Sequence, residues 1–431
     1  MMRLPALLAG AALAVFTPLS APATQVLTVV RAGRLVDVDR GEIRRDQLVF
    51  VRGPRIEAVH PGSTKIPAGA RVIDLSRYTV VPGLIDCHAH LIGDLTGHPL
   101  VPLERSAAQE AFSGVRNARA TLLAGFTTVR DIGTYRAFVD AALRDAIEDG
   151  TVIGPRMAVA GAYVTVSAGA GEVTGMAPDV ILPNDYRFGV ANSAPQVREK
   201  VRALLHGGAD FIKILATGAV LTRGTKPGVS EYTQEELKAA VDQAGEYGAF
   251  VAAHAHGAEG IKNAVRAGVR SIEHGSLMDD EAIALMKERG TYLVADIYNG
   301  DYIATVGREQ KWPDEYLRKN DETTEAQRSG FRKAVAAGVK IAYGTDSGVY
   351  PHGWNAKQLP YMVRFGMTPM GAIQSATIVA AELMGWSDRV GSIKPGKFAD
   401  LIAVEGDAMA DLASFAKVAF VMKGGMIYKG P

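Results

Sequence analysis

The sequence predicts an α/β protein: a (β/α)8 TIM barrel with a small β-sandwich domain built from both chain ends. Between about residues 83 and 386, short apolar runs that end in polar residues alternate with longer helical stretches, as in parallel βα units. Eight such runs are found, and a (β/α)8 barrel typically takes about 250 residues. Short β-like runs punctuated by Gly and Pro lie before and after this region.

The barrel prediction depends on these eight strands and the helices between them. Stretches such as EELKAAVDQAGEYG and AEGIKNAVRAG separate several of the strands. An open doubly wound sheet is the alternative, but no GxGxxG motif follows an early strand. The eight expected strands are GLIDCHAHL, TTVRDIG, RMAVAGAYVTVS, DFIKILATG, FVAAHAH, SIEHG, TYLVAD and KIAYGTD.

The flanking segments are expected to pair into one composite β-sandwich domain. The N-terminal part, residues 24–82, contains VLTVVRAGRLVDV and QLVFVRGPRIEAV. The C-terminal part, residues 387–431, contains GSIKPGKFADLIAV and VAFVMKGGMIY. Residues 83–386 then form the catalytic barrel.

Residues 1–23 have the layout of a secretory signal peptide. One Arg precedes a short apolar run, and Ala21-Pro22-Ala23 resembles a cleavage site. An uncleaved anchor is the alternative, but the run is short for a bilayer span. We therefore expect a periplasmic or secreted protein without a stable membrane anchor.

The charge balance and the single cysteine narrow the classes of partner and metal site. With 47 Lys and Arg against 46 Asp and Glu, nucleic acid is not expected as a partner. Cys87 is the one cysteine, so any metal site is built from histidines, carboxylates or a less usual ligand. No interface signature is seen, and a homo-oligomer stays an open option.

The first candidate ligands are in the segment Asp86-Cys87-His88-Ala89-His90. Alternate side chains of a strand share a face, so His88 and His90 point the same way and can hold one cation. An HxH pair by itself also arises by coincidence on a surface.

Four further polar residues stand at other strand ends. Lys213 lies in the apolar run Phe211–Leu215, where an ammonium is costly unless it is paired or neutralised. It either reaches out of the barrel end or has a lowered pKa and reacts with an electrophile; carbon dioxide would give a carbamate. His254, His274 and Asp346 end three later strands. Five strand ends thus carry candidate metal ligands.

This order of residues resembles that of the amidohydrolase superfamily. The resemblance runs from about residue 26 to the C-terminus and includes VVPGLIDCHAHL and GSIKPGKFADLIAV. Motifs such as AGFTTVRDIG, DFIKILATG, VAAHAHG and SIEHG resemble the branch of Xaa-Pro dipeptidases, imidazolonepropionase-like proteins and ochratoxin-type amidases.

The resemblance implies a binuclear centre, with zinc favoured and manganese or cobalt as alternatives. His88, His90 and Asp346 would hold the more buried metal, and His254 and His274 the second. Lys213, N-carboxylated, would bridge the two. A bridging hydroxide would attack the scissile carbonyl, while Asp346 would accept the proton and return it to the leaving amine.

Four residues are candidates for substrate binding. His256 lies two residues beyond a ligand and either contacts the substrate or orients His254. Tyr163 is expected to line the pocket. Many relatives carry Gly-Gly-His-Gly after strand three, whereas Ala170 stands at the histidine position here. This departure puts ordinary dipeptidase specificity in doubt. Arg223, in the loop after strand four, could meet a carboxylate or belong to a solvated loop.

The resulting functional hypothesis is a metal-dependent amidase or peptidase. Its expected substrates are small amides, either dipeptides or N-acyl amino acids with a free carboxylate, including N-acyl-phenylalanine compounds of the ochratoxin kind. The alternatives are a lactonase or cyclic-amide hydrolase, and a secreted metal-binding or solute-binding barrel without catalysis.

Overall fold

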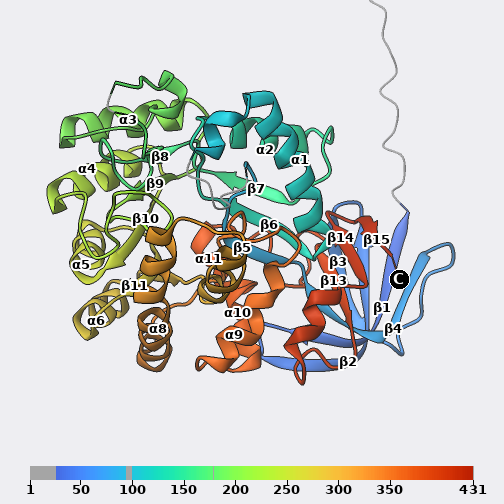
Figure 1. Ribbon diagram of the computed structural model, residues 1–431. Coiled ribbons are helices and arrows are strands. Elements are labelled where there is room, and N and C mark those ends of the chain that lie inside the picture. Colours follow the sequence, from blue (N-terminus) through green and yellow to red (C-terminus); the bar gives the residue numbers. More distant parts are fainter. Residues whose placement is uncertain (1–25, 94–99, 178, 431) are drawn as a thin grey trace, which may run out of the picture.

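The computed structural model describes residues 26–93, 100–177 and 179–430 of the chain. The expected signal peptide, residues 1–23, lies outside the described residues. Figure 1 shows a barrel-like body surrounded by helices, beside a separate sheet in which blue and red strands from opposite chain ends lie together.

The barrel strands pair in parallel in two sheets, with the orders β5-β6-β7 and β12-β11-β10-β9-β8. They agree with seven of the eight expected strands in position. The strands are β5 (Leu84–Ala89), β6 (Phe126–Asp131), β7 (Arg156–Val159), β8 (Tyr163–Val164), β9 (Ile212–Leu215), β10 (Val251–Gly257), β11 (Ser271–Leu277) and β12 (Tyr292–Val294).

Two expected strands differ in detail from the prediction. RMAVAGAYVTVS is divided into β7 and β8, with Gly161 at φ +76° between them. Residues 340–346 form no regular strand, although single parallel bridges join Ile341 to Leu293 and Ser347 to Ala89. This segment therefore closes the barrel between β12 and β5. Glycine at position 344 lets this segment pass close to β12, because a Cβ there would lie 2.3 Å from Val294 Cγ1.

Helices cover the outside of the barrel, and their ends follow local sequence signals. Ser106 with Gln109 and Thr233 with Glu236 form capping boxes at the starts of α1 and α4. The helices are α1 (Ala107–Leu123), α2 (Val139–Glu148), α3 (Ala194–His206), α4 (Gln234–Gly245), α5 (Ala258–Ala267), α6 (Asp280–Arg289), α7 (Asn299–Tyr302), α8 (Asp314–Ala337), α9 (Gln358–Arg364), α10 (Pro369–Ser375) and α11 (Ile378–Met384).

The two chain ends build one continuous seven-stranded sheet, in the order β15-β14-β13-β4-β1-β2-β3. Antiparallel pairing of β13 with β4 joins the C-terminal strands to the N-terminal ones. Buried side chains from both ends, such as Val30, Leu75 and Leu401, share one apolar cluster. The strands are β1 (Leu27–Asp37), β2 (Glu42–Arg52), β3 (Arg55–Pro61), β4 (Arg71–Pro82), β13 (Leu401–Glu405), β14 (Phe420–Lys423) and β15 (Met426–Lys429).

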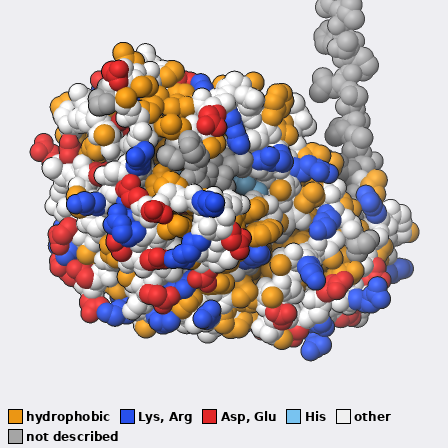
Figure 2. All heavy atoms as spheres, viewed as in Figure 1, with side chains coloured by type: hydrophobic (Ala, Val, Ile, Leu, Met, Phe, Trp, Pro, Cys, Tyr) orange, Lys and Arg blue, Asp and Glu red, His pale blue; other side chains and the backbone are white. Residues whose placement is uncertain are grey.

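The distribution of charged side chains on the surface agrees with the nearly equal numbers of acidic and basic residues in the sequence. In Figure 2, acidic and basic side chains are interspersed over the face shown. Among the described residues, none of the helices is both long enough and apolar enough to cross a bilayer.

Candidate metal centre and active site

Three of the expected ligands meet at the end of β5. His88 and His90 turn their Nε2 atoms towards Asp346, which lies in the segment that closes the barrel. The distances from Asp346 Oδ1 are 3.4 Å to His88 Nε2 and 3.2 Å to His90 Nε2. Burial opposes ionisation of Asp346, but the hydrogen bonds with these histidines outweigh it and hold the pKa of the carboxyl well below its usual range.

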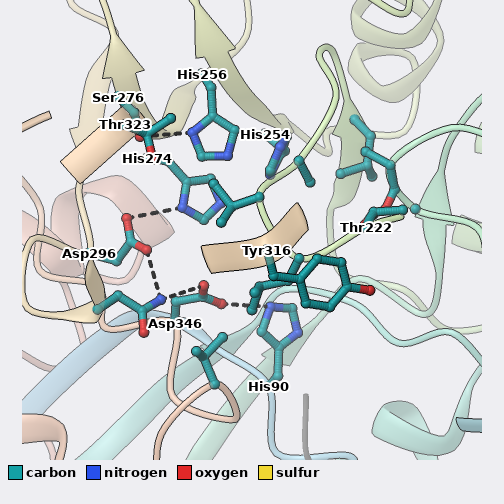
Figure 3. Close-up of a pocket in the computed structure, with 18 of the residues that line it drawn as sticks. His90, Thr222, His254, His256, His274, Ser276, Asp296, Tyr316, Thr323 and Asp346 are labelled. Atoms are coloured by element: carbon teal, nitrogen blue, oxygen red, sulfur yellow. Dashed lines mark hydrogen bonds and ion pairs between the residues drawn. The ribbon is translucent and has the colours of Figure 1, made fainter. Parts of the chain in front are cut away.

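A second group of three histidines stands beside the first. His254 and His256 come from β10 and His274 from β11, and their ring centroids are 4.6–4.8 Å apart. Figure 3 shows these three rings gathered above Asp346 and His90. The ring of His274 is also 4.8 Å from that of His88, so the two groups form one cluster.

The donors fit divalent metal ions in number, type and orientation. Two ligand groups, His88–His90–Asp346 and His254–His256–His274, each bring their ligand atoms within 4.8 Å of one another. Most ring Nδ1 atoms are held by a neighbour, which fixes the tautomer and leaves Nε2 for a cation. The Nδ1 partners are Glu273 for His88, the Gly133 carbonyl for His90, Ser276 for His256 and Asp296 for His274.

His254 is oriented in the opposite sense. Its Nε2 lies 3.3 Å from the Gly218 carbonyl oxygen, so Nδ1 is the atom left for a metal. Burial, followed by the charges of neighbouring histidines, lowers the pKa of His254 well below its ordinary value. A neutral imidazole is the form that binds metal.

Lys213 lines the same pocket from β9 and is 2 % exposed. Burial lowers the pKa of this ammonium to about 8, because the charged form is poorly solvated there. A fraction of the amine is therefore neutral near physiological pH, which is the form that reacts with carbon dioxide.

Two of the clustered residues have strained backbones. His274 has φ +69° and Asp346 has φ +55°, a region that side chains other than glycine seldom occupy. Such outliers are costly and concentrate at functional sites. Both side chains belong to the ligand cluster that lines the pocket.

Several supporting residues were not singled out from the sequence. Glu273 accepts from His88 Nδ1 at 2.8 Å, and its other oxygen lies 2.7 Å from Arg130 Nη2. Asp296 accepts from His274 Nδ1 at 3.0 Å, and Asn299 donates to both Asp296 and Asp346. The ends of the expected strands SIEHG and TYLVAD hold Glu273 and Asp296, so the strand-end argument applied to every strand would have found them. Asn299 follows its strand by several residues and carries no such signal.

The pocket above the cluster has an aromatic and apolar wall. Tyr163 lines it, with its hydroxyl 3.3 Å from His90 Nδ1, and its ring packs edge-to-face on Tyr135. Ala170 and Leu215 belong to the same apolar group. His256 also lines the pocket, so the structure brings three of the four candidate substrate residues together.

Arg223 is the candidate that the structure does not bring into the site. Its side chain is exposed and lies against Gly175, where a Cβ would be 2.8 Å from Arg223 Cδ. Its neighbour Thr222 turns inward instead and lines the pocket. An exposed guanidinium keeps its hydration, whereas turning into an apolar wall would remove it.

The family model for the amidohydrolase family matches residues 79–428 of the chain. The chain belongs to the amidohydrolase family. The match covers the whole barrel and the C-terminal strands of the sheet, and it confirms the family expected from the sequence.

Individual relatives agree in sequence and in structure. Ochratoxinase from Aspergillus niger is 32% identical, covering 94% of this chain and 87% of the relative. A crystal structure of a Xaa-Pro dipeptidase with bound methionine in the active site has a TM-score of 0.88 and 39% identity, covering 94% of this chain and all of the other. Imidazolonepropionase from Symbiobacterium thermophilum is 24% identical, covering 87% of this chain and 90% of the relative. The chain is thus a metal-dependent hydrolase with the expected barrel fold.

Proposed function

We propose that this amidohydrolase cleaves the amide bond between an acyl group and an amino acid that has a free carboxylate. We further propose a binuclear zinc centre with an N-carboxylated Lys213 as the bridge. The observation that carries the proposal is the convergence of His88, His90, His254, His274, Lys213 and Asp346 at one end of the barrel.

The chemistry follows from what each group can do. Two divalent ions bound by these ligands would supply a hydroxide nucleophile at neutral pH and polarise the scissile carbonyl. Asp346 accepts the proton of the attacking hydroxide and donates it to the amine nitrogen as the C–N bond breaks. Glu273 and Asp296 keep the rings of His88 and His274 in place, while the apolar wall excludes bulk water.

Among amides, N-acyl amino acids fit the pocket better than dipeptides with a free amino group. Within the described part of the lining, each of the three carboxylates already has a partner side chain. Glu172 pairs with Arg187 at 3.2 Å, Asp296 with His274, and Asp346 with His90. An ammonium buried without a counter-charge is costly, whereas a neutral acyl group gains from burial.

The aromatic wall favours a bulky or aromatic acyl group. Ala170 leaves space where many relatives of this branch carry a histidine, and Tyr135 and Tyr163 offer ring faces and edges to pack against. Ochratoxinase and a Xaa-Pro dipeptidase are both among the similar proteins. We propose an acyl-phenylalanine type of substrate. The expected export signal would suit scavenging or detoxification outside the cytoplasm.

A hydrolysis screen of the purified, zinc-loaded protein tests the proposal. N-benzoyl-phenylalanine is compared with Phe-Phe, a Xaa-Pro dipeptide and a set of lactones. The amino acid released from each amide and the hydroxy acid formed from each lactone are quantified. We expect the acyl compound to have the highest kcat/KM, and Asp346→Asn to abolish the signal on every amide. Cleavage of lactones without any amide would overturn the proposal, and a preference for Phe-Phe would overturn the assignment of the acyl pocket.

A further inference from the structure

Asn299 lies between the two carboxylates nearest the centre of the site. It is the first residue of α7, it lines the pocket, and it is 4 % exposed. Its Nδ2 is 2.9 Å from Asp346 Oδ2 and 3.0 Å from Asp296 Oδ2. One amide group therefore gives one N–H to each carboxylate. The opposite flip of the amide would set its oxygen against two acceptors, so the orientation is fixed.

The contact gives the two oxygens of Asp346 different surroundings. Oδ1 faces the Nε2 atoms of His88 and His90, whereas Oδ2 accepts from Asn299. The terminal torsion of an aspartate is broad and is selected by its hydrogen bonds. Without Asn299, Asp346 would lose this restraint, and the neutral donor between two like charges would be missing.

Asn299 is itself held by the framework. Its backbone N–H donates to the Asp296 carbonyl at 2.9 Å, and Asn320 of α8 donates to the carbonyl of the next residue, Gly300, at 3.0 Å. A Cβ on Gly300 would lie 2.4 Å from Thr324 Oγ1, so glycine is needed for α7 to sit this close to α8. A π-helical turn, Ile303–Gly307, follows directly, and such turns are frequent at functional sites.

We propose that Asn299 is a positioning residue that fixes the rotation of the Asp346 carboxylate for proton delivery to the leaving amine. The inference rests on the proposed amide hydrolysis. In that reaction the oxygen of hydroxide bonds to the carbonyl carbon, and the hydroxide proton passes to Asp346. The same proton then moves to the nitrogen as the C–N bond breaks, and Asp346 returns to its ionised form. Asn299 exchanges no proton and acts on the reaction through its contact with Asp346.

The test compares an amide with its ester isostere. An amine must be protonated before it leaves, whereas an alkoxide is a much better leaving group, so loss of proton delivery harms the amide more. The substrates are N-benzoyl-phenylalanine and O-benzoyl-phenyllactate, which share the acyl group and the carboxylate. For Asn299→Ala we expect kcat on the amide to fall about 10- to 100-fold, the effect of losing a hydrogen bond to a charged group, with KM nearly unchanged. On the ester we expect less than about a threefold loss.

Asn117→Ala is the matched control. Asn117 is equally buried, donates to the carbonyl of Leu91, and does not line the pocket. Its loss can lower the fraction of folded enzyme, but that affects both substrates alike and leaves the amide-to-ester ratio at the wild-type value. Asp346→Asn should shift the ratio in the same direction as Asn299→Ala. Equal losses on both substrates in Asn299→Ala would overturn the proposal.

A crystal structure of metal-loaded Asn299→Ala separates this inference from the proposed function. We expect the metal content to match that of the wild type and the Asp346 carboxylate to rotate about its terminal torsion. If the wild type hydrolyses neither compound, the proposed function fails, and the structure alone decides the inference. An Asp346 carboxylate that keeps its orientation in the variant would overturn it.

Discussion

Arg130 Nη2 lies 2.7 Å from Glu273 Oε1, and both side chains are completely buried. Arg130 also donates to the carbonyl of Cys87 at 2.6 Å, which ties β6 to the strand that carries the first two ligands. Burial opposes ionisation of Glu273, but the Arg130 charge and the hydrogen bond with His88 outweigh it and hold the pKa of this carboxyl far below its usual range. Glu273 is thus an ionised acceptor that fixes the proton of His88 on Nδ1.

Removing that charge should weaken metal binding without touching a ligand. We expect Glu273→Gln to lower metal affinity about 10- to 100-fold, the usual cost of losing the partner of a ligating histidine. Metal content after dialysis against graded chelator concentrations measures the change. Glu57→Gln is the control, because Glu57 belongs to an exposed ion pair with Arg52. Equal metal retention in both variants would contradict the role given to Glu273.

The charge of Arg130, the partner of Glu273, should contribute to the free energy of unfolding. Arg130→Met leaves Glu273 buried without its guanidinium, which costs about 3–5 kcal/mol of unfolding free energy. The double variant Arg130→Met/Glu273→Gln removes both charges and should be less destabilised than Arg130→Met alone. Thermal melting of the wild type, Arg130→Met, Glu273→Gln and the double variant measures this. Additive losses in the double variant would show that the two charges are not coupled.

The proton-transfer role of Asp346 should be separable from its role in metal binding. We expect Asp346→Asn to keep the metal, because the amide oxygen can still face His88 and His90, while turnover falls at least about 10²- to 10⁴-fold. Metal analysis and amide hydrolysis are measured on the same preparation. Turnover near the wild-type rate would rule out Asp346 as the proton carrier.

Metal removal should affect both activity and stability. Exhaustive chelation is expected to abolish hydrolysis and to lower the melting temperature, since a ligand that binds the folded state stabilises it. Adding back zinc, manganese or cobalt one at a time tests the preference for zinc. Full activity in protein shown to be metal-free would contradict a metal-dependent reaction.

The strand-end residues were predictable because two simple rules determine where their side chains lie. Alternation along a strand places His88 and His90 on one face, and the parallel barrel brings every strand end to the same rim. Together with the family resemblance, which chose His254 over His256, these rules identified six ligand candidates, and the structure brings all six to one site. The composite sheet was predictable for a similar reason, as strand-like runs occur at both chain ends.

Residues that support the ligands were harder to predict because their partners are far away in the chain. Arg130 and Glu273 are 143 positions apart, and nothing local to either shows that they pair. Asn299 begins the short helix α7 and Arg223 lies in the loop after β9, and at such positions the direction of a side chain depends on the local backbone and not on the alternation of a strand. Of the two options for Arg223, a contact with a substrate carboxylate or a place in a solvated loop, the structure shows an exposed side chain, while Thr222 beside it lines the pocket.

Glu231 supplies a pH dependence that is independent of the metal ligands. Its carboxylate accepts from the backbone N–H of Ala170 at 2.9 and 3.1 Å, and burial raises its pKa from 4.5 to about 7. Between these two values the folded protein keeps a proton that the unfolded chain releases, so this contribution to stability is present below about pH 4.5 and is lost as the pH rises through 7. Glu231→Gln can still accept from Ala170 but has no charge to desolvate. We expect its melting temperature relative to wild type to rise by about 2–4 °C between pH 5 and pH 8. Measuring both proteins side by side cancels any loss of metal at low pH, and a relative melting temperature that falls with pH would contradict the assignment.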